Sequence, residues 1–345
     1  MGVSGRIVKV TQKSTILWSN GRYISLPFIS KHAPGDIIDD KDRLLVPCRS
    51  TYDHARQQRH YRLVKRKMRH IRTIRNYLDE EGFIEVITKK LASERLKEPN
   101  IQPIITEAGI LAPSPEVRIK ELIVMGFDKL YELGFAYRND QEDRWHAKEF
   151  LMLEYYETYR DPKHLIERLL EMIRILNGSD LLNYRGTMVR LNNIRYVSYK
   201  EIFKDTLGID TDAPAVEKLK EQYMIDGDID RYELLDAIFA TKIQDKLGID
   251  IPTVIWGFPA ERASLAKVEN GVAMRFELYI AGIEIANCYE EETDPEAIGR
   301  RLHGSDKRFL QAMNMGLPPS SGIAVGIDRL IMLLEDLSSI HELYP

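Results

Sequence analysis

Apolar and polar residues alternate in two runs between residues 133 and 156, and a polar loop at 141–146 separates the runs. This pattern predicts a long antiparallel β-hairpin. One face of the hairpin carries Arg138 on the first strand and Glu154 on the return strand. Because a buried charge without a partner is costly, the two side chains either form an ion pair with each other or face a charged ligand.

The first 50 residues predict short strands, separated by turns at Asn20-Gly21 and Pro34-Gly35-Asp36, and so a small β-rich domain over residues 1–50. A helix is predicted over 54–80 from an apolar stripe of Val64, Met68, Ile71, Ile74 and Leu78. Arginines recur at similar spacing on another face, at Arg56, Arg59, Arg62, Arg66, Arg69 and Arg72. They form either a solvated helix surface or a docking face for an acidic macromolecule.

The rest of the chain, residues 54–345, mixes helices and strands in what we expect to be one larger domain. Ser114 and Pro115 predict the N-cap and first residue of a helix that carries Glu116. We also expect a mostly helical region to about residue 250, a strand over 253–258, a hairpin over 274–289, a helix from 295 to about 313, and a glycine-rich strand leading into a helix over 321–334.

The second hairpin brings two carboxylates together. If it turns at Ala281-Gly282, Glu284 lies opposite Tyr279 and Glu277 lies opposite Ala286. Glu277 and Glu284 then share a face, where they repel each other unless a cation lies between them or each pairs with its own Arg or Lys. Oxygen ligands of this kind suit Mg²⁺, and both interpretations stay open.

Composition is that of a globular protein, with 44% apolar and 30% charged residues in a chain of 345. The net charge of −4 gives no general reason to expect nucleic acid. Two cysteines, Cys48 and Cys288, indicate a reducing compartment without a disulfide framework. No stretch has the length and apolarity of a membrane span or a signal peptide, so we expect a cytoplasmic protein.

Four segments carry a family resemblance: SPEVRIKELIVMGF, YRND with RWHAKEFLMLEYY, RFELYIAGIEIANCYEEETD and SGIAVGIDRLIML. In this order they resemble the motifs of the class II aminoacyl-tRNA synthetases, lysyl branch, from about Tyr61 to the C-terminus. The resemblance implies an α+β catalytic domain, an antiparallel sheet flanked by helices.

Within that branch the chain is most similar to the elongation factor P lysyl transferases of the GenX or PoxA type. Only about 50 residues precede the basic helix, where lysyl-tRNA synthetases carry a longer anticodon-binding barrel, and Ala324 replaces the usual Gly of the last motif. The resemblance implies that ATP and Mg²⁺ activate lysine or (R)-β-lysine as an adenylate, which passes to a lysine side chain of elongation factor P. It further implies a homodimer, and neither tRNA nor a membrane is an expected partner.

The resemblance also implies roles for individual residues. Arg138 would contact the α-phosphate, Asp140 and Phe150 the adenine, and Arg329 the opposite face of the base or the γ-phosphate; Arg138 and Arg329 would be the catalytic charges. The other ATP-binding residues would be Asn139, His146, Glu284, Ile285 and Gly326. The amino-acid site would comprise Ser114, Pro115, Glu116, Tyr156, Asn287, Glu291 and Ala324. Mg²⁺ would bind Glu277 and Glu284.

Some positions depart from the family pattern: Asp140 replaces Glu, Ala147-Lys148 replaces Asn-Pro, Cys288 replaces Gly, and Lys89 replaces the Pro of the first motif. Strand alternation also places Glu291 on the face away from Glu284, so a bulge or a strand end is needed before it. Two other functions remain open. One is a compact enzyme that charges tRNA or another small acceptor, and the other is a non-catalytic paralogue that senses an amino acid or RNA.

Overall fold

The computed structural model describes residues 2–92, 101–303 and 306–344. It divides into two compact units, one of Met1–Ile71 with Leu343–Pro345 and one of Arg72–Glu342. The division falls within helix α1 (His54–Glu80), later than the predicted boundary between residues 1–50 and 54–345, which stays a prediction. Among the described residues, no helix is both long and apolar enough to cross a membrane.

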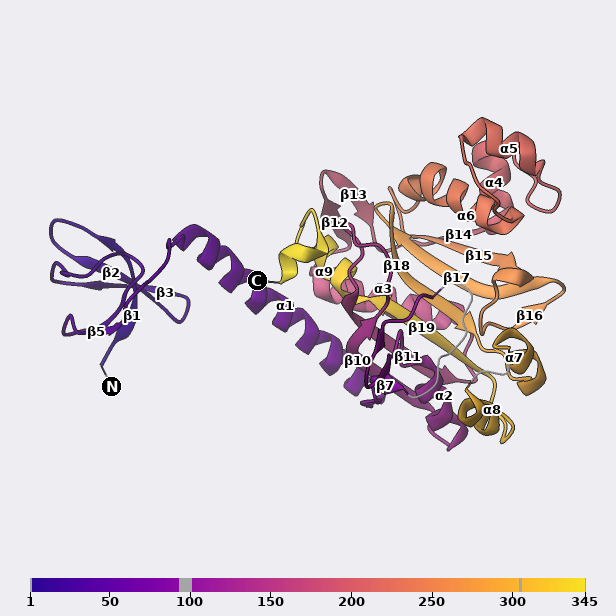
Figure 1. Ribbon diagram of the computed structural model, residues 1–345, viewed down its shortest axis with the longest axis horizontal. Coiled ribbons are helices and arrows are strands. Elements are labelled where there is room, and N and C mark those ends of the chain that lie inside the picture. Colours follow the sequence, from indigo (N-terminus) through magenta and orange to yellow (C-terminus); the bar gives the residue numbers. More distant parts are fainter. Residues whose placement is uncertain (1, 93–100, 304–305, 345) are drawn as a thin grey trace. The chain divides into compact units, whose positions relative to one another are not determined.

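The first unit contains a five-stranded antiparallel sheet in the order β3-β2-β1-β4-β5 (Figure 1). Its strands are β1 (Ser4–Val10), β2 (Thr15–Ser19), β3 (Arg22–Leu26), β4 (Ile37–Asp39) and β5 (Leu44–Val46). The Asn20-Gly21 turn that joins β2 to β3 has φ of 44° and 80°, the left-handed backbone that these residue types tolerate best. A small core of Ile7, Leu17 and Ile38 is fully buried.

Helix α1 has the predicted bounds, and Asp53 caps its start by accepting the Arg56 backbone N–H at 3.0 Å. The predicted apolar stripe is wrong at its beginning. Val64 and Met68 are 44% and 46% exposed, and Leu63 takes their place in the buried stripe. The sequence allowed this error because apolar residues occupy both neighbouring positions, 63 and 64.

The second unit is organised around one large sheet in the order β14-β15-β17-β18-β19-β11-β10-β6, with β16 paired to β17. Among the described strands of this sheet, only the β10–β6 and β14–β15 pairs are parallel; the predicted α+β class is confirmed. The strands of this sheet are β6 (Ile84–Glu85), β10 (Lys129–Tyr137), β11 (Glu149–Thr158), β14 (Arg195–Ser198), β15 (Thr253–Pro259), β16 (Val268–Glu269), β17 (Val272–Ile280), β18 (Ile283–Glu290) and β19 (Ser320–Gly326). Two smaller sheets pair β12 (Leu181–Tyr184) with β13 (Thr187–Arg190), and β9 (Gly109–Leu111) with β7 (Leu91–Ala92) and β8 (Ile105–Thr106).

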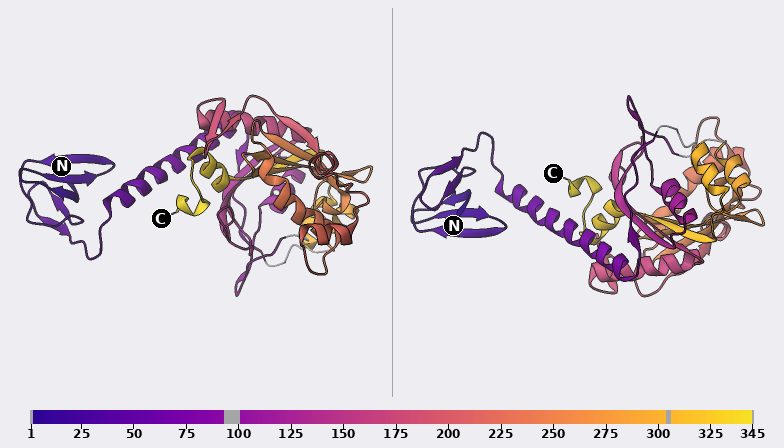
Figure 2. Two further views of the ribbon diagram at one scale, coloured as in Figure 1. Left: turned by 90° about the horizontal axis from the view of Figure 1, so that it is seen from above. Right: turned by 90° about the horizontal axis from the view of Figure 1, so that it is seen from below.

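Helices cover both faces of the large sheet (Figure 2). They are α2 (Glu116–Val124), α3 (Pro162–Asn177), α4 (Tyr199–Leu207), α5 (Val216–Tyr223), α6 (Arg231–Lys242), α7 (Pro295–Arg301), α8 (Lys307–Met313) and α9 (Ile327–Leu334), with 3₁₀ turns at Gln244–Lys246, Ala260–Arg262 and Ile340–Leu343. Helix α3 packs on β18 and β19, and the Tyr155 hydroxyl of β11 donates to the Leu165 carbonyl of α3. Tyr156, the next residue, points to the other face and packs with α2, α7 and α8. The alternation predicted for the first hairpin is therefore confirmed.

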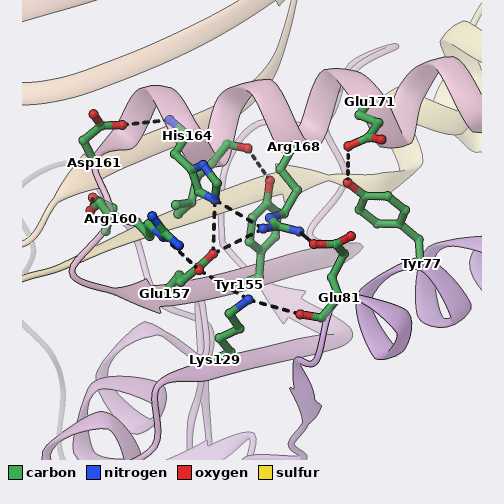
Figure 3. A network of polar contacts seen from close by, with 12 residues as sticks. Tyr77, Glu81, Lys129, Tyr155, Glu157, Arg160, Asp161, His164, Arg168 and Glu171 are labelled. Atoms are coloured by element: carbon green, nitrogen blue, oxygen red, sulfur yellow. Dashed lines mark hydrogen bonds and ion pairs between the residues drawn. The ribbon is translucent and has the colours of Figure 1, made fainter.

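A network of ion pairs and hydrogen bonds joins the last turns of α1 to β11 and α3 (Figure 3). Arg168 of α3 pairs with Glu81 and, at 3.5 Å, with the buried Glu157 of β11. Lys129 also pairs with Glu157, at 3.4 Å, and donates to the Glu81 carbonyl at 3.1 Å. Each buried charge thus has an opposite charge beside it, as burial requires.

Three local predictions need correction. The helix expected from 295 to about 313 is two helices, α7 and α8. Helix α2 begins at Glu116 with Pro115 at its N-cap, although the Ser114 hydroxyl still accepts the Glu116 N–H at 3.3 Å. In the second hairpin Glu277 pairs with Asn287 instead of Ala286, because a β-bulge at Ile285 interrupts the register.

Candidate active site

A cavity of about 330 Å³ opens on the sheet face that carries Tyr156, over strands β11, β19 and β18. Two cross-strand rows form part of its floor. In one row Asn287 pairs with Ala324, which pairs with Glu154. In the other, Tyr289 pairs with Gly322, which pairs with Tyr156. The sheet register therefore aligns residues from three different segments of the chain.

Arg138 lies at one end of this cavity, directly after β10. Its backbone N–H donates to the Lys148 carbonyl at 2.9 Å, which continues the β10–β11 ladder by one residue. The guanidinium lies 5.5 Å from the centre of the Phe150 ring and donates to the Pro113 carbonyl at 3.3 Å. Among the described residues, Arg138 and Glu154 form no ion pair with each other, so the structural ion pair considered from the sequence is absent from this structure.

Arg329 faces the same end from the start of α9. Its guanidinium donates to the backbone carbonyls of Trp145 and Glu284, each at 3.1 Å, and lies 3.4 Å from the Glu284 carboxylate. Asp328 beside it is buried and accepts the backbone N–H of Leu151 at 2.9 Å, which fixes α9 against β11. Two half-buried arginines with spare donors, Arg138 and Arg329, therefore flank one end of the cavity, where they suit phosphate oxygens.

Glu277 and Glu284 do share a face of the sheet, and each also has a cationic partner. Arg275 and the Tyr279 hydroxyl both lie 2.5 Å from Glu277 oxygens, while Glu284 faces Arg329. Burial, with Glu284 adding to it, raises the pKa of the Glu277 carboxyl, and Arg275 opposes that rise. Mg²⁺ usually binds one or two carboxylates together with substrate phosphates. Glu284, which lines the cavity, fits this role; Glu277 fits it only if it shares its charge with Arg275.

Charged groups are paired much more tightly at the other end of the cavity. Lys120 of α2 is 1% exposed and lies 2.6 Å from Glu116, one helical turn before it, and 2.5 Å from Glu291. Glu154 is 2% exposed and accepts the Tyr156 hydroxyl at 3.0 Å. Two carboxylates therefore contact one ammonium group and a third, Glu154, is buried nearby, so the cluster holds more carboxylates than cations.

The protonation of these carboxylates follows from their burial. Loss of solvent, with the charge of Glu116 nearby, raises the pKa of Glu154 to about 8. Burial also raises the pKa of Glu291 above its usual range, against the opposing attraction of Lys120. The two carboxylates raise the pKa of Lys120, so this amine stays charged. A bound cation would favour the ionised forms of Glu154 and Glu291.

Most residues proposed from the sequence meet in this cavity. Its lining includes Arg138, Asp140, His146, Phe150, Glu284, Ile285, Gly326, Arg329, Ser114, Glu116, Tyr156, Asn287 and Ala324. Four do not line it: Asn139, Pro115, Glu277 and Glu291. Asn139 lines a separate shallow hollow beside Asp140. Glu291 lies just behind the wall, because a Cβ on the lining Gly322 would come 2.6 Å from its carboxylate. The bulge at Ile285 supplies the shift that the alternation required, because Asn287, Tyr289 and Glu291 then follow the same phase as Glu284.

Sequence reasoning missed three groups that the structure brings to this site. Lys120 follows Glu116 by four residues, a spacing that predicts contact on a helix. Arg275 precedes Glu277 by two, so the pair shares a strand face. Trp145, which lines the cavity and binds Arg329 through its carbonyl, gave no signal beyond its place in the polar loop.

Comparison with known proteins agrees with this geometry. The family model of the class II tRNA synthetases (D, K and N) matches residues 46–345. An elongation factor P–(R)-beta-lysine ligase from Hamiltonella defensa is 30% identical, over 79% of this chain and 90% of its own length, and the corresponding ligase from Proteus mirabilis is 30% identical over 80% and 92%.

A lysine–tRNA ligase from Listeria welshimeri is 34% identical over 78% of this chain. The chain spans only about 60% of the length of that relative, against about 90% for the elongation factor P ligases. On the extent of the family match, the chain belongs to the class II tRNA synthetases of the D, K and N type.

Proposed function

We propose that the protein activates lysine or (R)-β-lysine with ATP and transfers it from the adenylate to a lysine side chain of elongation factor P. One observation carries the proposal: a single cavity has two arginines and a carboxylate at one end and a partly neutralised cluster of buried carboxylates at the other. The first end suits a triphosphate, and the second suits an amino acid with a cationic side chain.

In the first step the amino-acid carboxylate attacks the α-phosphorus of ATP. A bond forms between the carboxylate oxygen and phosphorus, the bond to the bridging oxygen breaks, and pyrophosphate leaves. No side chain needs to transfer a proton, so the contribution of the protein is positioning and charge stabilisation. Arg138 and Arg329 would neutralise the phosphate charge, with Phe150 under the adenine. Mg²⁺, held by Glu284 with Glu277 nearby, would screen the phosphates when bound.

Glu116 and Glu154, which line the cavity, would contact the substrate amines, and the charge of Glu291 lies just behind the wall. Lys120 neutralises one of these three carboxylates. The remaining charge suits an amino acid with two ammonium groups, a description that α-lysine and β-lysine share. Ala324 lies in the row between Asn287 and Glu154, so its methyl group narrows the floor between the two substrates.

In the second step the amine of the acceptor lysine attacks the adenylate carbonyl. An amide bond forms, the bond to the phosphate oxygen breaks, AMP leaves, and the proton of the amine passes to solvent. The acceptor is proposed from the names of the relatives whose length this chain matches to about 90%. We further propose a cytoplasmic homodimer, on the family resemblance of the first motif.

The test is ATP–pyrophosphate exchange with a panel of amino acids, followed by mass spectrometry of elongation factor P incubated with the enzyme, ATP and the best amino acid. We expect exchange only with lysine-type amino acids and a mass increase on one lysine of the acceptor. Exchange with none of them would contradict the proposal. Sedimentation of the purified chain would test the dimer.

A second candidate is the charging of tRNA, because lysine–tRNA ligases match the chain at up to 34% identity. The two candidates share the adenylate step and differ only in the acceptor. Labelled lysine that becomes acid-precipitable with tRNA, and not with elongation factor P, would favour the second.

A further inference from the structure

The polar loop at residues 141–146, between β10 and β11, forms part of the cavity wall. Trp145 and His146 line the cavity, whereas the loop residues before them are exposed. The Asp143 carboxylate accepts the backbone N–H groups of Trp145 and His146 at 2.6 and 2.8 Å, which closes a tight turn. Bonds inside the loop fix its shape, but its position at the cavity depends on contacts with other segments.

A segment that follows α9, residues 338–342, supplies two of these contacts. The backbone N–H of Ile340 donates to the Arg144 carbonyl at 3.0 Å, and the Nε2 atom of His341 lies 2.8 Å from the Asp143 carbonyl. A carbonyl oxygen can only accept, so Nε2 carries the hydrogen in this contact. Ile340 is buried and lines the cavity, whereas His341 is exposed. The side chain of His341 therefore connects this segment to the loop from the solvent side.

The supporting segment is itself anchored to the second unit. The Glu342 carboxylate accepts both the backbone N–H of Ser338, at 2.9 Å, and its hydroxyl, at 2.6 Å. Just before this turn, the Leu337 backbone N–H donates to the Met332 carbonyl of α9 at 2.9 Å. The Leu337 carbonyl accepts the Tyr184 hydroxyl of β12 at 3.1 Å. The segment is thus fixed to α9 and to the β12–β13 hairpin, so it can hold the loop in one position.

The loop in turn holds one of the two arginines of the cavity. The Arg329 guanidinium donates to the Trp145 carbonyl at 3.1 Å, so three consecutive loop carbonyls, at positions 143–145, accept from α9 or from the segment that follows it. A displaced loop would therefore release Arg329 and move the wall that Trp145 and His146 form. A ligand at this end would then have to order the loop and a long side chain on binding, which lowers affinity.

We propose that His341 is a positioning residue for the nucleotide: it holds the loop 141–146 in place, pre-organises the arginine end of the cavity and so raises the affinity for ATP. The inference rests on the proposed function, which names ATP as the ligand of this end. Among the described residues His341 is not one that lines the cavity, so it acts through the loop. The amino-acid end should not respond, because Lys120 and Glu154 belong to α2 and β11.

The test is the dissociation constant of ATP for the full chain, measured by isothermal titration calorimetry with MgCl₂ and without amino acid. His341→Ala removes the donor and should raise this constant about 2–10-fold, the usual effect of losing one hydrogen bond. His341→Gln keeps an N–H donor at similar reach, so it should restore most of the parent affinity. The matched control is His60→Ala, at a half-exposed histidine of α1, and it should bind ATP within about two-fold of the parent chain.

The position of the loop is measured separately with trypsin, which cleaves after Arg144. Without ligands, His341→Ala should be cut at this site about 2–10-fold faster than the parent chain, because the loop is open for a larger fraction of the time. His341→Gln should be cut at the parent rate. The urea midpoint and the KM for lysine in ATP–pyrophosphate exchange should stay near the parent values in both variants, which distinguishes positioning from a general loss of structure.

Three results would overturn the proposal. They are parent-like or tighter ATP binding by His341→Ala, equal weakening in His341→Gln, and unchanged cleavage after Arg144 in a variant that has lost affinity. A parent chain that binds ATP but exchanges pyrophosphate with no amino acid would refute the proposed function and leave the role of His341 standing. A parent chain that binds no ATP would contradict both.

Discussion

The two ends of the cavity are built on opposite electrostatic plans. At the end that carries the two arginines, Glu284 is 33% exposed in its side chain and lies 3.4 Å from Arg329, whose guanidinium also donates to two backbone carbonyls. At the end that carries the carboxylate cluster, Lys120 and Glu291 are 2% and 0% exposed in their side chains and lie 2.5 Å apart. The first end is half-solvated and loosely paired, whereas the second is dry and tightly paired.

Because of this difference, we expect the two ends to contribute differently to stability and to catalysis. Loosely paired, half-exposed arginines lose little when a triphosphate displaces their present partners, so they are free to stabilise charge that develops in the reaction. A dry cluster cannot rearrange cheaply, because any unpaired charge there is costly. We therefore expect changes at the dry end to affect folding and amino-acid affinity, and changes at the open end to affect rate.

The largest expected effect comes from the dry end. Lys120→Met leaves Glu116 and Glu291 without their shared cation, and removal of one partner from a buried pair typically costs about 3–5 kcal/mol. We expect a loss of this size in the free energy of unfolding, measured by urea denaturation, and a raised KM for the amino acid. Lys246→Met, at an exposed lysine, is the control. If Lys120→Met lowered the free energy of unfolding by less than about 1 kcal/mol, Lys120 would not be the shared cation of a tightly paired buried cluster.

Arg138→Ala tests the open end. It should lower the rate of ATP–pyrophosphate exchange by about 10²–10³-fold, the usual cost of removing one charge-stabilising donor, while the urea midpoint stays near that of the parent chain. Arg190→Ala, an exposed arginine of β13, is the matched control. An unchanged exchange rate would show that Arg138 does not stabilise the reaction. A large fall in the urea midpoint would show that this end is coupled to folding as tightly as the carboxylate cluster.

The pH dependence of the free energy of unfolding tests the carboxylate cluster alone, because it leaves the arginine end unchanged. The folded pKa of Glu154 is about 8, above the value near 4.5 of an unfolded glutamate. Its contribution to stability is therefore full below about pH 4.5 and is lost as pH rises through about 8. The difference in unfolding free energy between the parent chain and Glu154→Gln should change by about 1.4 kcal/mol or more between pH 5 and pH 8.5. A difference independent of pH would contradict the assigned shift.

The smallest effect is expected for Phe150, which we propose to stack on the adenine. Phe150→Leu removes the ring beside Arg138 but keeps an apolar side chain, so it should raise the KM for ATP by about 2–10-fold, as the loss of about 0.5–1.5 kcal/mol of aromatic contact implies. The KM for the amino acid should not change. Equal rises in both KM values would indicate that the two ends are coupled through the sheet.

The sequence was informative wherever one short-range rule decided the outcome. Alternation placed Glu154 and Tyr156 on the cavity face, and Asp161 before Pro162 begins α3 as its cap should. It was uninformative where distant segments settle the outcome. The fact that Glu291 pairs with Lys120 depends on how the end of β18 meets α2, and no local spacing connects residues 171 positions apart. The split between α7 and α8 was marked in the sequence by Gly304 followed by Ser305 and Asp306, residue types typical of a helix end and of the cap of the next helix, and the prediction overlooked this signal.

The bulge in β18 has a consequence for how one strand can serve two ligands. Glu284 and Asn287 are separated by an odd number of positions, which in a regular strand would put them back to back. The extra residue, Ile285, shifts the phase of the strand by half a repeat, so one stretch of backbone presents the Glu284 carboxylate and the Asn287 amide, which we propose to face the metal and the amino acid, to the same cavity. Deleting that single residue would leave the composition of the site almost intact and yet point one of its two halves away from its substrate.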